Sequence, residues 1–304
     1  MVKDQKNKGK DGLCFQQIEL FIRYLQVEKN YADNTISAYQ RDLAKLFVFC
    51  QGRDVAEWCD IDVKMLNLFV MELRHANTSN RSIRRNLSSI RGFFAFLLRL
   101  GALSENCAKD ISSPKLEQTL PKTIDYDELS KMMQPRSDRF DELRNVAMIE
   151  LIYSCALRVS ELVSVDLNDV DLKEGFVKVM GKGGKARFVP VGQNAIAAIK
   201  RYLSKRPVCE SNALFVNQKQ NRVAVRSVQN IIKRRALDVG ITFNVHPHML
   251  RHAAATHFLQ SSHDLRSVQE FLGHKSIKST QVYTHLDFLE LSKVYDSCHP
   301  RAKK

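Results

Sequence analysis

The sequence contains no Cys-x-x-Cys pair, no long apolar run and no apolar segment near its first residue. Its 7 cysteines lie far apart, and their odd number and wide spacing argue against both a disulfide framework and a zinc knuckle. No apolar stretch approaches the ~18 residues that a membrane-spanning helix requires. The polar, lysine-rich beginning of the chain is unlike a secretory signal. We therefore expect a soluble, cytoplasmic protein with reduced thiols.

Acidic residues are few relative to basic ones. Asp and Glu total 33 against 47 Lys and Arg, which gives a formal net charge of +14. This excess favours a nucleic-acid partner, because each phosphate that a cation neutralises releases condensed counterions. A soluble protein that is merely basic is the alternative. With 304 residues and 44% hydrophobic content, the chain can bury two cores, so two domains are expected.

One segment breaks the helical periodicity and divides the chain. Residues 109–122 contain two prolines flanked by serines and lysines, a composition typical of an extended linker. Before this linker we predict a disordered basic tail over 1–11 and a helical domain over 12–108. After it we predict a mixed helical and β domain over 123–298 and a basic tail over 299–304.

The helical domain contains one helix with a cationic face. Apolar residues recur every three or four positions from Ile83 to Leu97, and arginines lie on the adjoining face. Such a helix can pack one side into a core and lay the other along a phosphate backbone. A solvated surface helix is the alternative. The candidate DNA-binding residues are Arg81, Arg84, Arg85 and Arg91.

The second domain mixes both kinds of element. Asp125 and Glu128 have the spacing of a capping box that begins a helix. A mostly apolar helical stretch over 143–156 is expected in the core. The segments 176–180 and 187–191 are predicted to be two strands of a hairpin around a glycine-rich turn.

The segment His-Pro-His-Met-Leu-Arg-His at 246–252 contains the first candidates for chemistry. Helical spacing places Arg251 one turn after His248, so both side chains can point at one ligand. A guanidinium can bind two phosphate oxygens at once, which an ammonium cannot. We expect the other histidines here, and His257, to be structural or to lie on the surface. Zinc binding by His246 and His248 would lack a third credible ligand.

Four other residues complete the candidate set, and each is ordinary by itself. Arg158 could simply pair with a nearby carboxylate, and a lysine at a turn, such as Lys182, usually faces water. The glycines around Lys182 do allow the backbone to approach a ligand closely. His274 lies in a Leu-Gly-His motif, and Tyr283 follows it by nine residues in what reads as an amphipathic helix.

In this order the six residues resemble the active-site set of the tyrosine site-specific recombinases, which are relatives of phage integrases. The motifs His-x-Leu-Arg, Leu-Gly-His and a tyrosine nine residues later all match, and every position is filled. The resemblance implies a mainly α fold with a small β-sheet: an all-helical core DNA-binding domain followed by an α+β catalytic domain. The catalytic set is Arg158, Lys182, His248, Arg251, His274 and Tyr283.

The resemblance also implies roles for these residues. Tyr283 would attack the scissile phosphate and form a 3′-phosphotyrosine, His248 would accept the phenolic proton, and Lys182 would protonate the departing 5′ oxygen. Arg158 and Arg251 would clamp the phosphate, and His274 would add a hydrogen bond to it. The reaction needs neither ATP nor a metal, and no other cofactor is expected.

The segment from Tyr283 to Lys303 is similar to the recombinases that resolve chromosome dimers before bacterial cell division. This likeness implies as partners a double-stranded recombination site, a sister tyrosine recombinase in a tetrameric synapse and a septal DNA translocase. An integrase of a mobile element, a type IB topoisomerase-like enzyme and a non-enzymatic DNA-binding protein are the alternatives. In the family the segment after the nucleophile docks on the neighbouring subunit, and packing on its own domain is the other possibility.

Overall fold

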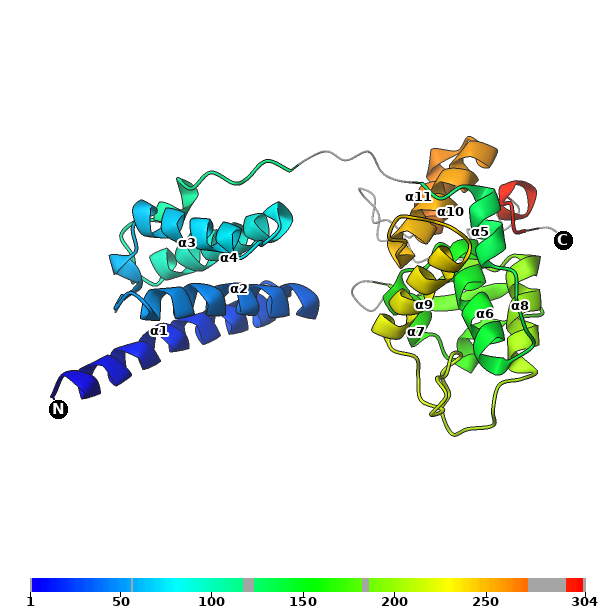
Figure 1. Ribbon diagram of the computed structural model, residues 1–304, viewed down its shortest axis with the longest axis horizontal. Coiled ribbons are helices and arrows are strands. Elements are labelled where there is room, and N and C mark those ends of the chain that lie inside the picture. Colours follow the sequence, from blue (N-terminus) through cyan, green and yellow to red (C-terminus); the bar gives the residue numbers. More distant parts are fainter. Residues whose placement is uncertain (1, 56, 117–122, 182–185, 273–293, 303–304) are drawn as a thin grey trace. The chain divides into compact units, whose positions relative to one another are not determined.

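The computed structural model describes residues 2–55, 57–116, 123–181, 186–272 and 294–302 (Figure 1). The mainly helical fold with one small sheet that the sequence predicted is confirmed. Within the described segments, no helix combines the length and the apolar character needed to cross a bilayer.

The chain divides into two compact units, 1–120 and 121–304. In the described part of the first unit, helices enclose a core rich in leucine and aromatic side chains, with Phe93 and Trp58 in edge-to-face contact at 5.1 Å between ring centroids. Its elements are α1 (Val2–Val27), α2 (Asp33–Gln51), the 3₁₀ helix η1 (Trp58–Asp60), α3 (Val63–His75), α4 (Asn80–Arg99) and η2 (Cys107–Lys109).

The first helix corrects one prediction. Residues 1–11 were expected to be a disordered tail, whereas α1 begins at Val2. The four lysines of this stretch belong to a residue type that forms helices well and loses little rotamer freedom in a helix. They extend a helix that is already anchored in the core by Phe21 and Leu25, which are 1% and 4% exposed.

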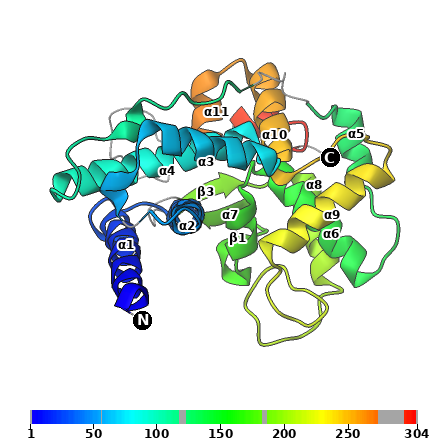
Figure 2. The ribbon, with the colours of Figure 1, turned by 60° about the vertical axis from the view of Figure 1, so that its left-hand side comes forward.

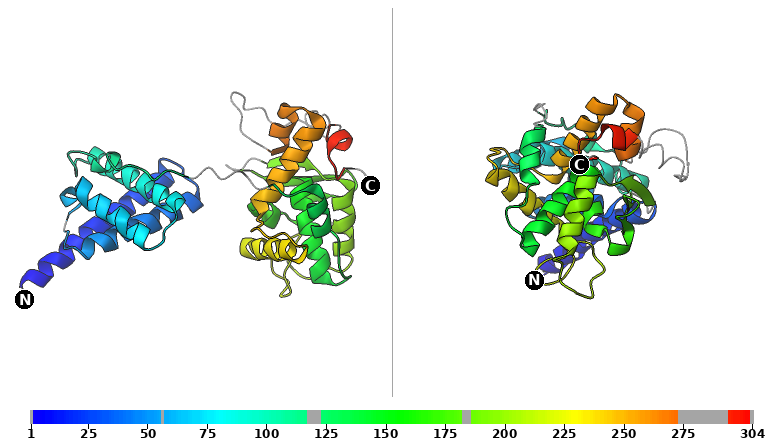
Figure 3. Two further views of the ribbon diagram at one scale, coloured as in Figure 1. Left: turned by 45° about the horizontal axis from the view of Figure 1, so that its top comes forward. Right: turned by 90° about the vertical axis from the view of Figure 1, so that its right-hand side faces the viewer.

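The second unit surrounds the central helix α6 (Phe140–Ser154), most of whose side chains are buried. This helix, which the apolar run predicted, packs against α8 (Gln193–Leu203) and α10 (Pro247–Ser262) (Figure 3). The predicted capping box of Asp125 and Glu128 is confirmed at the start of α5. The remaining elements are α5 (Tyr126–Met132), α7 (Val159–Ser164), η3 (Leu167–Asp169), β1 (Val170–Asp171), β2 (Phe176–Met180), β3 (Ala186–Pro190), α9 (Val225–Asp238) and α11 (Leu265–Leu272).

The sheet is antiparallel in the order β1-β2-β3, and β2 contacts α7. Its strands β1 and β3 are labelled in Figure 2. The predicted hairpin is confirmed, with Val177 opposite Val189. Inward residues alternate with exposed ones, as a half-buried strand requires. The sequence missed β1, because a strand of two residues is too short to show alternation.

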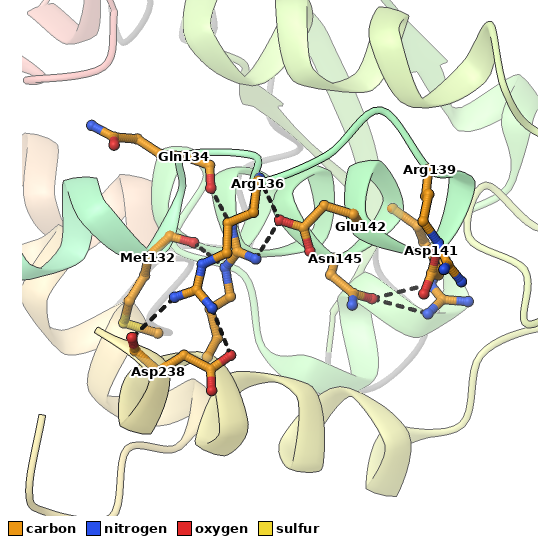
Figure 4. Close-up of polar contacts among 10 residues, drawn as sticks. Met132, Gln134, Arg136, Arg139, Asp141, Glu142, Asn145 and Asp238 are labelled. Carbon is orange, nitrogen blue, oxygen red and sulfur yellow. Dashed lines mark hydrogen bonds and ion pairs between the residues drawn. The ribbon is translucent and has the colours of Figure 1, made fainter. Parts of the chain in front are cut away.

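Two arginines, Arg235 and Arg136, link α9 to the connection between α5 and α6 (Figure 4). Arg235, which is 5% exposed, donates hydrogen bonds to the carbonyl oxygens of Met132 and Gln134 and to the carboxylate of Glu142. Arg136 pairs with Asp238 at 3.0 Å between Nη1 and Oδ2. These contacts hold α9 in place although it lies far along the chain from α5.

The end of the chain packs into the second unit. The sequence placed the domain boundary at 298 and expected a basic tail after it, but His299 and Ala302 are each 4% exposed. The Arg301 guanidinium pairs with Glu150 of α6, which is 2% exposed. A buried carboxylate requires such a partner, so the unit extends through Ala302.

Candidate active site

Arg158 lies where the chain passes from α6 into α7, as the N-cap residue of α7. Its backbone N–H donates to Glu161 Oε2 at 2.8 Å, and its Nη1 donates to Glu161 Oε1, also at 2.8 Å. Glu161 therefore caps the helix and orients the guanidinium at the same time. The side chain of Arg158 is 37% exposed, so it remains accessible to a ligand.

Arg251 lies on α10, which begins with Pro247 in its first turn, a position that favours proline. It is 7% exposed. Its guanidinium donates to the carbonyl oxygens of Ala156 and Leu272, the latter at 2.6 Å, and its Nη1 lies 3.8 Å from Glu161 Oε2. The structure therefore brings the two arginines that the sequence singled out to the same carboxylate.

Two residues at this site were not among the predicted ones. Glu161 is 4% exposed and accepts hydrogen bonds from Arg158 and from Arg187 of β3. Arg187 is 6% exposed and occupies an inward position of its strand, opposite Val179. An arginine at an inward, otherwise apolar strand position is the signal that could have identified it.

The electrostatics of this arginine cluster, defined as Arg158, Arg187, Arg251 and Glu161, favour an anion. Three guanidinium groups face one carboxylate, so two positive charges are not balanced within the cluster. Burial, and then the charge of Arg158, lower the pKa of Arg251 to about 10, while Glu161 opposes this shift. Burial alone would raise the pKa of Glu161, but the hydrogen bonds from Arg187 and Arg158 hold it below its usual value. A bound phosphate would supply the missing negative charge.

His248 lies on the first turn of α10, one turn before Arg251, and is exposed. Burial and the neighbouring charge of His248 lower the pKa of His246, the N-cap residue of α10. His257 has the structural role that was expected, because its Nδ1 lies 2.8 Å from the hydroxyl of Tyr153. Within the described segments, no group of three or more His, Cys, Asp or Glu side chains is placed to hold a metal ion.

Lys182, His274 and Tyr283 lie outside the described residues. Lys182 lies in the segment that joins β2 to β3, and the described segment that precedes His274 ends at Leu272, two positions before it. The carbonyl oxygen of Leu272 is a hydrogen-bond acceptor of Arg251.

The four candidate DNA-binding arginines of α4 have different surroundings. The predicted apolar stripe is fully buried from Ile83 to Leu97, and Arg81 and Arg84 are exposed on the other side. Arg85 pairs with the buried Asp42 through two hydrogen bonds of 2.8 and 2.9 Å.

Arg91 also uses its guanidinium within the chain. It donates to the carbonyl oxygens of Ala108, at 3.0 Å, and Ile111, and to Ser113 Oγ at 3.2 Å. It thus fastens the chain where it leaves the first unit, a role that the sequence did not predict. A second basic face, not predicted, lies on α9, where Arg226, Lys233 and Arg234 are exposed.

Comparison with known proteins decides the family. The model of the phage integrase family matches residues 122–290, and that of the phage integrase N-terminal SAM-like domain matches residues 18–101. The chain belongs to the phage integrase family. As a member of this family it is a site-specific tyrosine recombinase, an enzyme that cleaves and rejoins DNA strands.

Curated relatives in the phage integrase family match over almost their whole length. The tyrosine recombinase XerC of Pseudomonas fluorescens is 43% identical over 95% of this chain and 98% of its own. The tyrosine recombinase XerC of Shigella flexneri is 40% identical over 94% of this chain and 97% of its own. The likeness to chromosome-dimer recombinases that the sequence suggested is thus confirmed as a likeness to XerC.

A solved structure confirms the fold. The XerH site-specific recombinase, bound to its palindromic difH substrate after cleavage, superposes with a TM-score of 0.67. It is 23% identical, and the match covers 96% of this chain and 89% of the XerH chain. The phage integrase fold therefore extends over both units.

Proposed function

We propose that the enzyme cuts DNA through Tyr283, which becomes joined to a 3′ phosphate, while Arg158 and Arg251 hold the scissile phosphate. The observation that carries this proposal is the unbalanced positive charge of the arginine cluster. Negative charge gathers on the non-bridging oxygens as the phosphate is attacked, and fixed cationic donors stabilise it. Arg251 is held by backbone carbonyls and Arg158 by Glu161, so both are oriented before DNA binds.

A phenol suits a reaction that must be reversed. When the Tyr283 oxygen attacks phosphorus, the bond to the 5′ oxygen breaks and the energy of the phosphodiester is kept in the new ester. With a pKa of ~10, a phenol is both a fair nucleophile and a fair leaving group for rejoining. His248 takes the proton from Tyr283, and Lys182 gives a proton to the 5′ oxygen. His274 adds a hydrogen bond to the phosphate.

Each unit is proposed to contact DNA through a basic helix of its own. Exposed Arg81 and Arg84 of α4 contact the DNA backbone from the first unit, and the exposed basic face of α9 does so from the second. Arg85 and Arg91 support DNA binding indirectly, through their hydrogen bonds to Asp42 and to the carbonyl oxygen of Ala108. The residues 109–122 act as the linker between a core-binding domain and a catalytic domain.

The cellular role is proposed from the relatives. The match of this chain to XerC proteins over almost their whole length supports resolution of chromosome dimers at cell division rather than integration of a mobile element. The enzyme would act in the cytoplasm on a short chromosomal site, in a tetrameric synapse with a sister recombinase of the XerD kind. A septal DNA translocase would activate it.

A nicked suicide substrate tests the chemistry. Such a substrate loses the short strand after cleavage, so a covalent protein–DNA adduct accumulates and is seen as a slower band on a denaturing gel. The unaltered enzyme should form this adduct with a candidate chromosomal site, and Tyr283→Phe should form none. An adduct of equal yield with Tyr283→Phe would contradict the proposal.

A further inference from the structure

Arg187 is a buried arginine to which the proposed chemistry assigns no role. It lies on β3 with its side chain turned inward, among positions that are otherwise valine. Its side chain is 7% exposed, and both of its terminal nitrogens already donate to a carboxylate. A buried arginine is costly unless it is paired, and its partner is therefore informative.

Its partner is Glu161, whose two carboxylate oxygens accept hydrogen bonds from the two terminal nitrogens of the guanidinium. Nη1 donates to Oε1 at 2.8 Å and Nη2 donates to Oε2 at 3.1 Å. Arg158 supplies one further donor to each oxygen, through its side chain and its backbone N–H. Arg251 is left 3.8 Å away, beyond hydrogen-bond distance, with its donors on backbone carbonyls.

This arrangement matters because a carboxylate and a phosphate accept the same paired hydrogen bonds from a guanidinium group, so they compete for its N–H donors. Without Arg187, Glu161 would be a buried charge with vacant acceptor positions. The nearest donors are Arg251, at 3.8 Å, and Arg158. In a low-dielectric interior the carboxylate would draw them toward itself.

We propose that Arg187 is a positioning residue that saturates Glu161 and so leaves Arg251 and Arg158 available to the scissile phosphate. The inference rests on the proposed function, in which these two arginines clamp that phosphate. Arg187 acts through Glu161 and does not touch DNA.

Two variants and two substrates test this role. Arg187→Met keeps an unbranched side chain but removes the guanidinium and its charge, and Arg187→Met with Glu161→Gln also removes the competing carboxylate. Cleavage is measured on a suicide substrate with an ordinary scissile phosphate and on one with a methylphosphonate there, which lacks the negative charge. Arg144→Met is the matched control, since Arg144 is another buried arginine of the same unit that lies outside the arginine cluster and donates to Asn145 and to the carbonyl oxygen of Val216.

On the ordinary phosphate, Arg187→Met should cleave about 10- to 100-fold more slowly, somewhat less than the ~10²–10³ loss typical of a donor that touches the charge itself. On the methylphosphonate the loss should shrink to about threefold or less, because its ground state is neutral and only one non-bridging oxygen remains to gather charge. Adding Glu161→Gln should restore part of the rate on the ordinary phosphate. Arg144→Met should cleave at the unaltered rate on both substrates once the folded fractions are matched.

Several results would overturn the proposal: no loss in Arg187→Met, an equal loss on both substrates, or no relief from Glu161→Gln. So would rescue by a bridging 5′ phosphorothiolate, which would mean that Arg187 acts on the leaving group. If Arg187→Met does not fold, Glu161→Gln is compared with the double variant. Their rates should agree within about threefold, and a tenfold gap would refute action through Glu161.

The proposed function and the role of Arg187 can be refuted separately. If the unaltered enzyme forms no adduct at Tyr283, the proposed function is wrong whatever the variants do. If it forms the adduct and Arg187→Met cleaves normally, only the role of Arg187 is wrong.

Discussion

The ion pair between Arg301 and Glu150 predicts how strongly the end of the chain stabilises the second unit. Glu150 is 2% exposed, and its carboxylate receives two donors from Arg301, one of them at 3.1 Å. Arg301→Met leaves that carboxylate buried without its partner. Removing one partner of a buried pair typically costs ~3–5 kcal/mol. In a unit of this size that corresponds to a fall in Tm of roughly 10 °C.

The loss should depend on pH. Burial raises the pKa of Glu150, and Arg301 opposes that rise. Without Arg301 the folded-state pKa lies further above the unfolded one, so stability is lost as the pH increases through it and is regained when the carboxyl is protonated. The difference in unfolding free energy between Arg301→Met and the unaltered protein should therefore shrink as the pH falls.

Urea unfolding between pH 5 and pH 8 measures this difference directly. Arg301→Met with Glu150→Gln is the control, since it removes both charges and should recover most of the stability. A loss under about 1 kcal/mol, as expected of an exposed pair, would refute the argument that Arg301 seals a buried carboxylate. So would a loss that is unchanged across the pH range.

Three further predictions concern single side chains. Lys182→Ala should slow cleavage, and a bridging 5′ phosphorothiolate should rescue it, because a thiolate leaves without a proton; absence of rescue would exclude Lys182 as the acid. Arg84→Ala should weaken DNA binding and lower the salt slope by about one, and an unchanged slope in a binding titration would place Arg84 away from the phosphates. Burial, with the charges of His257 and Arg301, lowers the pKa of His299 to about 3, so the folded state stays neutral while the unfolded histidine binds a proton below pH ~6.5. Stability should therefore fall as the pH drops from 7 to 5, and His299→Asn should flatten this dependence in thermal melts; an equal slope would contradict the assignment.

The parts of the fold that could be predicted from the sequence have short-range causes. The stripe of α4 follows from helical periodicity between Ile83 and Leu97, and all of its predicted apolar positions are buried. The capping box of Asp125 and Glu128 depends on residues three positions apart. The hairpin follows from alternation on either side of a glycine-rich segment.

The parts that could not be predicted depend on contacts distant in sequence. Arg187 and Glu161 are 26 positions apart, and nothing in the local pattern pairs them. Arg91 was interpreted as a DNA contact because it shares a face with Arg84, but its partners come from the chain beyond α4. Composition likewise suggested a free basic tail at the end of the chain, whereas the buried Glu150 holds Arg301 in place.

The central claim is that one phenolic oxygen becomes esterified to DNA beside the arginine cluster. Mass spectrometry of peptides from the trapped adduct, after nuclease digestion, locates that bond. We expect a nucleotide attached through its 3′ phosphate to Tyr283. A nucleotide on another side chain, or one attached through its 5′ phosphate, would contradict it.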